Sequence, residues 1–151
     1  LLFLEAELPG VHELEVRVRY ADTDKMGVVY HAHYILYFEM GRTELMRATG
    51  LTYRQLEERG VLLVVVEATA RYHANVGYDE SIRVRTRVGD VGRVRIRFDY
   101  EAFAGDRLLA EGSTTLACVD AKGKVRALPE DVTRLLREAA PSAAGGTCGA
   151  P

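Results

Sequence analysis

The chain has 151 residues, a length that fits one domain burying about 70% of the surface of its unfolded chain. Its formal net charge of −2 gives no overall attraction to nucleic acid or to anionic membranes. The two cysteines, Cys118 and Cys148, are too few for a disulfide framework or a four-cysteine zinc site. Free thiols are typical of a reducing compartment, and the apolar run at residues 1–4 lacks a basic leader and is too short for a signal peptide. We therefore expect a cytoplasmic protein without a membrane span.

One strand and one long helix are predicted in the first third of the chain. Over residues 14–20, apolar residues alternate with Glu and Arg, which is typical of a half-buried strand. From about Ala32, apolar residues recur every three or four positions as far as Thr49, and Gly50 is placed to end this helix. Gly41 lies in its middle, where glycine costs on the order of 1 kcal/mol relative to alanine. This glycine predicts that a sheet or another backbone approaches the helix closely.

A short helix and four strands are predicted next. Thr52 and Gln55 form a capping-box pattern and Gly60 a stop, which predicts a helix over residues 53–59. Strand patterns cover residues 61–72, 81–88, 93–103 and 107–119. Because Gly- and Asp-rich turns separate these strands, we expect them to pair as an antiparallel meander.

The last helix and a tail complete a single domain. Pro129 opens a helix over residues 130–139, and residues 140–151 are too poor in large apolar side chains to order themselves. We therefore predict an α+β fold in which one antiparallel sheet wraps around the long helix. This domain covers residues 1–139, and the tail over 140–151 is expected to be disordered.

Residues that carry chemistry concentrate in the loop between the first strand and the long helix. The run reads Tyr20-x-Asp22-Thr23-Asp24-x-x-Gly27-Val28-Val29-Tyr30-His31-Ala32, followed by Tyr34, Phe38-Glu39 and Arg42-Thr43-Glu44. On this pattern the chain resembles the hotdog-fold acyl-CoA thioesterases of the 4-hydroxybenzoyl-CoA thioesterase family, especially their tol-pal-linked branch. The likeness extends over residues 14–136, with weaker matches at Tyr72-x-Ala74, Tyr78-Asp79 and residues 115–120.

Asp24 is the first candidate for a catalytic residue. Cleavage of a thioester needs a nucleophile or a base that activates water, and a carboxylate beside a helix start can serve as either. From the residue alone, an Asx turn or a helix cap is the better interpretation of such an aspartate. The resemblance instead implies catalysis by Asp24. Asp22 lies two residues earlier and is interpreted as a structural or loop-capping residue, because strand geometry would point it to the opposite side.

The helix start supplies the second part of the predicted site. The resemblance implies that the backbone N–H of His31 polarises the thioester carbonyl, and free amides at a helix N-terminus do stabilise negative charge. The His31 side chain is also assigned to the site, with a local hydrogen bond to the backbone as the alternative. Gly27 is expected to let substrate approach the loop closely, and Tyr30 to help shape the site.

Two further histidines are predicted to line the substrate site. Where the family usually has Asn, this chain has His33, and where it often has Pro, this chain has His73. Both departures point to substrate preference. A metal site built from His31, His33 and an aspartate lacks a third firmly placed ligand, so no metal is expected. Coenzyme A is expected only as part of the substrate, with no other cofactor.

The long helix carries a reserve candidate, Glu39. Some hotdog hydrolases take their carboxylate from this helix, so Glu39 is the alternative catalytic residue if Asp24 proves dispensable. Glu39 and Arg42 are three positions apart, a spacing that favours a local ion pair on the helix surface. The ion pair is the better interpretation of this spacing.

Six arginines are predicted to share one face of a hairpin: Arg83, Arg85, Arg87, Arg93, Arg95 and Arg97. The commonest outcome for such a pattern is a solvated face balanced by carboxylates such as Asp99 and Glu101. Docking of coenzyme A phosphates and binding of nucleic acid are the alternatives. Single-strand binding needs aromatic side chains between the cations, and this face has none. We expect a mixed, salt-bridged face with one or two residues reaching a nucleotide.

The sequence thus predicts an acyl-CoA thioesterase that releases a free acid and coenzyme A. The resemblance implies a homodimer or homotetramer with active sites at subunit interfaces, and no nucleic-acid partner is expected. Two other classes remain open. One is a hotdog dehydratase or hydratase acting on acyl thioesters, and the other is a non-catalytic module that binds acyl-CoA or a protein.

Overall fold

The structure, a computed structural model, describes residues 10–141. The run at residues 1–4 and residues 142–151 of the predicted tail lie outside the described residues. In chain order the elements are β1 (His12–Arg17), the 3-10 turn η1 (Tyr20–Asp22), α1 (His33–Ala48), α2 (Tyr53–Glu58), β2 (Leu62–Tyr72), β3 (Ser81–Val91), β4 (Arg95–Ala104), β5 (Arg107–Val119) and α3 (Glu130–Ala139).

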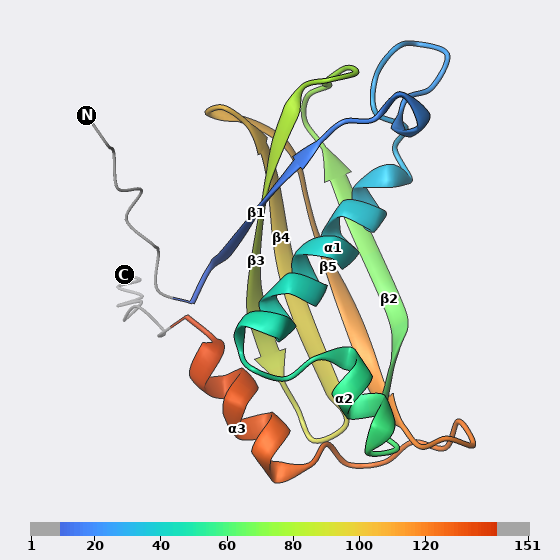
Figure 1. The fold of residues 1–151 in the computed structure, drawn as a ribbon, viewed down its shortest axis with the longest axis vertical. Helices are drawn as coiled ribbons and strands as arrows, with labels where there is room; N and C mark the ends of the chain where they lie inside the picture. The colour runs from blue at the N-terminus through green and yellow to red at the C-terminus, as the bar shows by residue number, and fades with distance from the viewer. Residues whose placement is uncertain (1–9, 142–151) are drawn as a thin grey trace, which may run out of the picture.

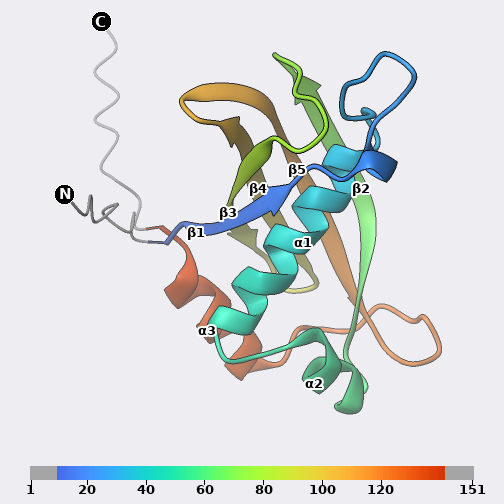
Figure 2. The ribbon, with the colours of Figure 1, turned by 45° about the horizontal axis from the view of Figure 1, so that its top comes forward.

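The strands form one five-stranded antiparallel sheet in the order β1-β3-β4-β5-β2. The long helix α1 lies across one face of the sheet, which curves around it, while α2 and α3 sit near the lower end (Figures 1 and 2). Strands β1 and β2 are the two edges. This arrangement confirms the predicted hotdog fold of an antiparallel sheet wrapped around one long helix. The predicted meander is right only for β3, β4 and β5. Strand β2 does not pair with β3, because β1 occupies that edge of β3 and β2 pairs with β5 at the far side of the sheet.

The first strand ends three residues earlier than predicted. Val18 still pairs through its backbone, donating to Glu80 O at 2.9 Å and accepting from Asp79 N at 3.0 Å. Tyr20 then enters the 3-10 turn and is 79% exposed, whereas the alternating pattern had placed it with the buried residues. The turn forms because Asp22 folds back and accepts the backbone N–H of Arg19 at 3.0 Å.

Two glycines set the distance between α1 and the sheet. A Cβ on Gly41 would collide with Thr86 Oγ1 and lie 3.0 Å from Val84 Cγ1, both on β3. A Cβ on Gly112 of β5 would lie 2.8 Å from Phe38 of α1. Phe38 is fully buried there. The close approach predicted from Gly41 is therefore confirmed, and the sheet has a matching glycine on its own side.

Gly112→Ala is expected to lower the free energy of unfolding by about 1–3 kcal/mol, the usual range for overpacking a core. The added methyl would meet Phe38 and the carbonyl of Thr69 on the neighbouring strand. Chemical denaturation measures the change. Gly92→Ala is the matched control, because its Cβ would have no neighbour closer than 3.5 Å. Equal stabilities of the two variants would contradict this account of the packing.

Candidate active site

The loop before α1 is a tight β-hairpin over residues 23–29, seen at the top of Figure 1 beside the start of the helix. Thr23 and Val29 form a bridge, and Asp24 N donates to Val28 O at 2.9 Å. Gly27 N donates to Asp24 O at 2.9 Å and closes the turn. Gly27 has a φ of 79°, which glycine adopts without strain. Its backbone conformation therefore adds a second reason for glycine at this position.

The Asp24 carboxylate has one oxygen engaged and one free. Its Oδ1 accepts the backbone N–H of Met26 at 2.9 Å, so the Asx turn weighed from the sequence is present. Its Oδ2 accepts from no residue in the described range 10–141, and the side chain is partly exposed. The turn holds the carboxylate in a fixed orientation while one oxygen stays accessible.

The first turn of α1 leaves two backbone donors open. His33 N donates to Tyr30 O at 2.8 Å and Tyr34 N to His31 O at 3.4 Å. The N–H groups of His31 and Ala32 donate to no acceptor within residues 10–141. These open amides stand at the positive end of a 16-residue helix, where they favour a partner that carries negative charge.

Aromatic rings frame the helix start. The Tyr30 ring, 44% exposed, has its centroid 4.4 Å from that of His31. Tyr72, at the end of β2, donates its hydroxyl to His31 O at 2.9 Å. No sequence pattern connects Tyr72 with His31, because 41 positions separate the two residues and only the fold brings them together. Tyr72 thus ties the edge strand to the helix start.

Below the hairpin, Asp22 is completely buried and pins the loop to the helix. Its carboxylate accepts from Arg19 Nη2 and from the Tyr37 hydroxyl, each at 2.9 Å, and lies 3.3 Å from His33 Nε2. Its backbone carbonyl accepts Tyr30 N at 2.9 Å. Asp22 is therefore structural, as the sequence indicated. His33 contacts this carboxylate beneath the loop, on the buried side of the helix start.

The charge of Asp22 is set by two opposing effects. Burial alone would raise the pKa of its carboxyl group, but hydrogen bonds from Arg19 and Tyr37 outweigh burial and leave the pKa lowered. Burial, reinforced by the bond to Asp22, raises the pKa of Tyr37. At neutral pH the network therefore consists of an ionised Asp22 and a neutral Tyr37.

A family model described as the thioesterase-like superfamily matches residues 18–136, which include the hairpin, α1 and all of the sheet except β1. The chain belongs to this superfamily. It is 38% identical over 119 residues to the acyl-CoA thioesterase YbgC of Haemophilus influenzae, covering 78% of this chain and 88% of that protein. The acyl-CoA thioester hydrolase YbgC of Escherichia coli O6:H1 is 35% identical over 119 residues, covering 78% and 89%.

A solved structure shares the superfamily fold. The DHNA-CoA thioesterase of Staphylococcus aureus superposes with a TM-score of 0.81 at 31% identity, covering 85% of this chain and 89% of that one. These matches support the family resemblance drawn from the loop motif, including its tol-pal-linked branch.

Two of the predicted residues of this thioesterase-like domain lie away from the hairpin. His73 follows Tyr72, and its Nε2 is 3.2 Å from Glu111 Oε1, so its side chain turns from the helix start. Glu39 is exposed on α1. The ion pair predicted between Glu39 and Arg42 is wrong, because Arg42 turns inward and donates to Tyr53 and to residues of the sheet.

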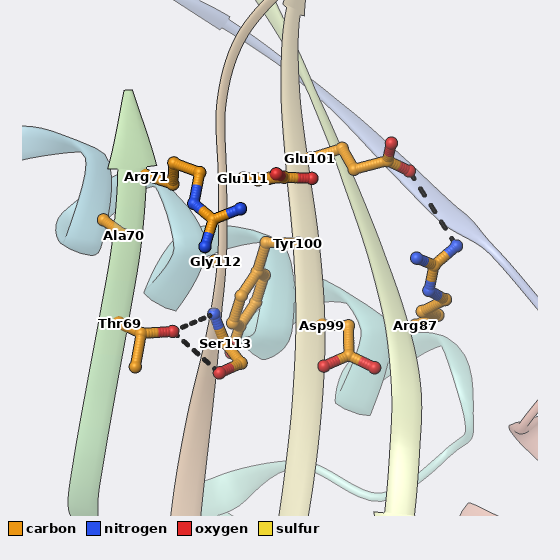
Figure 3. A pocket seen from close by; sticks show the side chains of 10 residues that line it. All are labelled: Thr69, Ala70, Arg71, Arg87, Asp99, Tyr100, Glu101, Glu111, Gly112 and Ser113. Atoms are coloured by element: carbon orange, nitrogen blue, oxygen red, sulfur yellow. Dashed lines mark hydrogen bonds and ion pairs between the residues drawn. The ribbon is translucent and has the colours of Figure 1, made fainter. Parts of the chain in front are cut away.

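The helix-free face of the sheet carries a shallow pocket of about 380 Å³, shown in Figure 3. Charged and hydroxyl side chains line it: Thr69, Arg71, Arg87, Asp99, Glu101, Glu111 and Ser113. On this face Arg97 lies 3.1 Å from Asp99 and Arg87 lies 3.8 Å from Glu101. The expected mixed, salt-bridged face is confirmed. Arg93, however, precedes β4 and is not one of its strand residues.

Three other features of the described residues bear on the chemistry. No three His, Cys, Asp or Glu side chains within residues 10–141 are grouped so that they could hold a metal ion. Cys118 is a free, buried thiol, and burial raises its pKa. None of the helices between residues 10 and 141 is long and apolar enough to cross a membrane.

Asp22→Asn is expected to destabilise the domain at neutral pH, by about 1–3 kcal/mol for a buried hydrogen-bonded group that loses its partners. Because the folded pKa of Asp22 is lowered, its contribution is present above the ordinary value of 3.8 and is lost as the pH falls below it. Thermal melts between pH 7 and pH 3 should show the gap between variant and parent closing in acid. Asp106→Asn, at an exposed turn, is the control. A gap that does not depend on pH would contradict the role given to the charge.

Proposed function

We propose that this protein hydrolyses acyl-CoA thioesters to a free acid and coenzyme A. The observation that carries the proposal is the pair of open amides at His31 and Ala32, which follow directly on the hairpin that holds Asp24. Membership of the thioesterase-like superfamily and the named activity of the YbgC relatives support the same reaction. The predicted dehydratase and binding-module alternatives have no observation of their own in their favour.

In this mechanism the thioester carbonyl oxygen accepts the N–H of His31. The amide and the helix dipole stabilise the negative charge that develops on that oxygen. Asp24 acts through its free Oδ2. As a general base it takes a proton from water, whose oxygen attacks the carbonyl carbon. The C–S bond then breaks, and the thiolate leaves and is protonated as coenzyme A.

The alternative role of Asp24 is that of a nucleophile. Its carboxylate would attack the carbonyl carbon and expel the thiolate, which forms a mixed anhydride. Water would then cleave the anhydride and regenerate Asp24. Both routes use the same two groups and give the same products, so the proposal includes either.

We further propose that two copies pair through the edge strand β2 and close the site between them. One side of β2 pairs with β5, and none of the described strands pairs with its other side. Val64, Val65 and Val66 follow one another on this strand at 41%, 50% and 49% exposure. A long apolar edge with open backbone groups invites pairing with another strand. Tyr72, at the end of the same strand, contacts His31, so a partner on β2 would lie next to the site.

Asp24→Asn is expected to lower kcat by at least about 100-fold, since the amide can neither take a proton nor attack as a nucleophile. Asparagine keeps an oxygen that can accept the Met26 N–H, so the hairpin should survive. Thiol release from short, long and aromatic acyl-CoA thioesters measures the effect.

Asp106→Asn is the matched control for this substitution, because it removes a carboxylate from an exposed turn elsewhere. Undiminished turnover by Asp24→Asn would remove Asp24 from the mechanism and direct attention to Glu39. A parent protein that releases no thiol from any of these substrates would overturn the proposed activity.

Val66→Lys is expected to convert a dimer into monomers and to reduce activity in parallel, because a charge would be buried between the two edges. Light scattering coupled to gel filtration gives the mass in solution. Val125→Lys changes a similarly exposed valine, 59% accessible, on the turn after β5 and should leave the mass unchanged. A monomeric parent protein with full activity would refute the proposed pairing.

A further inference from the structure

Arg42 is a buried cation, and no carboxylate between residues 10 and 141 forms an ion pair with it. Only 6% of the residue is exposed. Its Nε donates to the Tyr53 hydroxyl at 2.8 Å, and Nη1 donates to Thr114 Oγ1 at 3.2 Å and to the Tyr100 hydroxyl at 3.4 Å. None of these groups carries a charge at neutral pH. No Asp or Glu among residues 10–141 forms an ion pair with Arg42, and its Nη2 donates to none of those residues.

Such an arrangement is unusual, since a guanidinium stays charged at every pH that proteins experience. Taking a charge out of water is costly unless an opposite charge accompanies it. The three hydroxyls fix the guanidinium in place and satisfy part of it. They leave one amino group and the whole positive charge available to an anion that arrives from outside the domain.

Arg42 lies on the same side of α1 as the proposed reaction centre at His31. Arg42 follows His31 by eleven residues, which at 3.6 residues per turn is three turns and about 20°. The two residues therefore lie on the same side of the helix, about 16 Å apart along its axis. Gly41 faces β3, whereas Arg42 reaches Thr114 on β5, so this side of α1 is the one directed toward β5 and β2.

Strand β2 presents small apolar residues toward this side of the helix. Ala70 pairs with Gly112 and Ala68 with Thr114, and cross-strand partners project from the same face. Gly112 and Thr114 face Phe38 and Arg42 of α1, so the two alanines do so as well. Ala68 is exposed although it faces the helix side of the sheet.

We call the surface formed by Ile35, Val65, Ala68 and Ala70 the α1–β2 strip. Ile35 is partly buried and precedes Arg42 by seven residues, so it lies on the same side of α1. Val65, one register position beyond the bulge in β2, is 50% exposed on the same face, opposite the buried Leu116. Helix α1 and strand β2 meet near the hairpin and diverge toward α2 in both views (Figures 1 and 2). The strip thus leads from His31 and Tyr72 at one end to Arg42 and Tyr53 at the other.

We propose that the α1–β2 strip binds the acyl chain of the substrate and that Arg42 binds a carboxylate at the far end of that chain. The preferred substrates are then coenzyme A monothioesters of dicarboxylic acids. This inference rests on the proposed thioesterase activity and specifies its substrate class. The apolar strip suits the methylene chain, and a guanidinium with open donors suits a terminal carboxylate. The Tyr53 and Tyr100 hydroxyls hold the guanidinium in the position that receives it.

The test compares matched pairs of coenzyme A thioesters with six, eight, ten and twelve carbons in the acyl chain. One member of each pair ends in a methyl group and the other in a carboxylate. The carboxylate member is expected to have a kcat/KM at least about tenfold higher at the length that spans the strip, because a charge-assisted bond replaces an unpaired buried cation. Arg42→Gln should abolish this preference, so that the two members of each pair are hydrolysed with kcat/KM values within a few-fold of each other.

Arg47→Gln is the control variant, because Arg47 is an exposed arginine one and a half turns further along the same helix. It should keep the preference of the parent. If Arg42→Gln does not fold, a second measurement on the parent protein decides the matter. Free dicarboxylic acids should raise its melting temperature more than monocarboxylic acids of the same length.

The outcomes separate this inference from the proposed activity. Faster hydrolysis of the methyl-terminated thioester at every length would overturn the role of Arg42 and leave the thioesterase activity intact. Absence of thiol release together with stabilisation by free dicarboxylic acids would overturn the activity and support the site. Stabilisation by neither class of acid, combined with a dimer that Arg42→Gln dissociates, would show that a carboxylate of a second copy occupies Arg42 and would refute the substrate class.

Discussion

The geometry of the helix start depends on one buried carboxylate. Asp22 is the point where the end of β1, the hairpin and the first turns of α1 are joined, through Arg19, Tyr30 and Tyr37. An amide can stabilise a developing charge only if it is already oriented, because reorganisation during the reaction costs the energy that catalysis needs. Asp22 supplies that orientation from the buried side of the loop.

The two aspartates of the loop therefore differ in their environment. They are separated by one residue, yet Asp22 is enclosed and fully bonded, while Asp24 sits in the turn above with one oxygen open. The hairpin makes this possible because it reverses the chain directly after Asp22. A fully bonded, buried carboxylate and a partly exposed carboxylate with one open oxygen thus stand two positions apart in the loop.

The sequence was sufficient for the elements, the fold class and the loop, because these depend on local signals, whereas the pairing of β2 with β5 joins distant segments and was not predicted. Alternation identified the strands, the spacing of apolar residues identified α1, and Gly41 revealed the close contact with β3. Tyr20 was wrongly predicted to be a buried strand residue. The Asp22 side chain accepts the backbone N–H of Arg19, and the chain forms a turn there instead of continuing the strand. The ion pair predicted between Glu39 and Arg42 was wrong for a different reason. The true partners of Arg42 lie 11, 58 and 72 positions away, and no spacing rule within a helix reveals them.

The two bare surfaces of the sheet differ in a way that bears on its behaviour in a crowded solution. On the helix-free face, arginines alternate with carboxylates such as Asp99 and Glu101, and this pattern discourages stacking against another sheet. The edge at Val64, Val65 and Val66 instead presents three exposed apolar side chains in a row, with the single charge of Glu67 directly after them. A chain that is newly made, or diluted away from other copies, therefore exposes the part of its sheet that is most prone to aggregation at β2. Covering this edge would therefore remove apolar surface from water without any change in the stability of the domain itself.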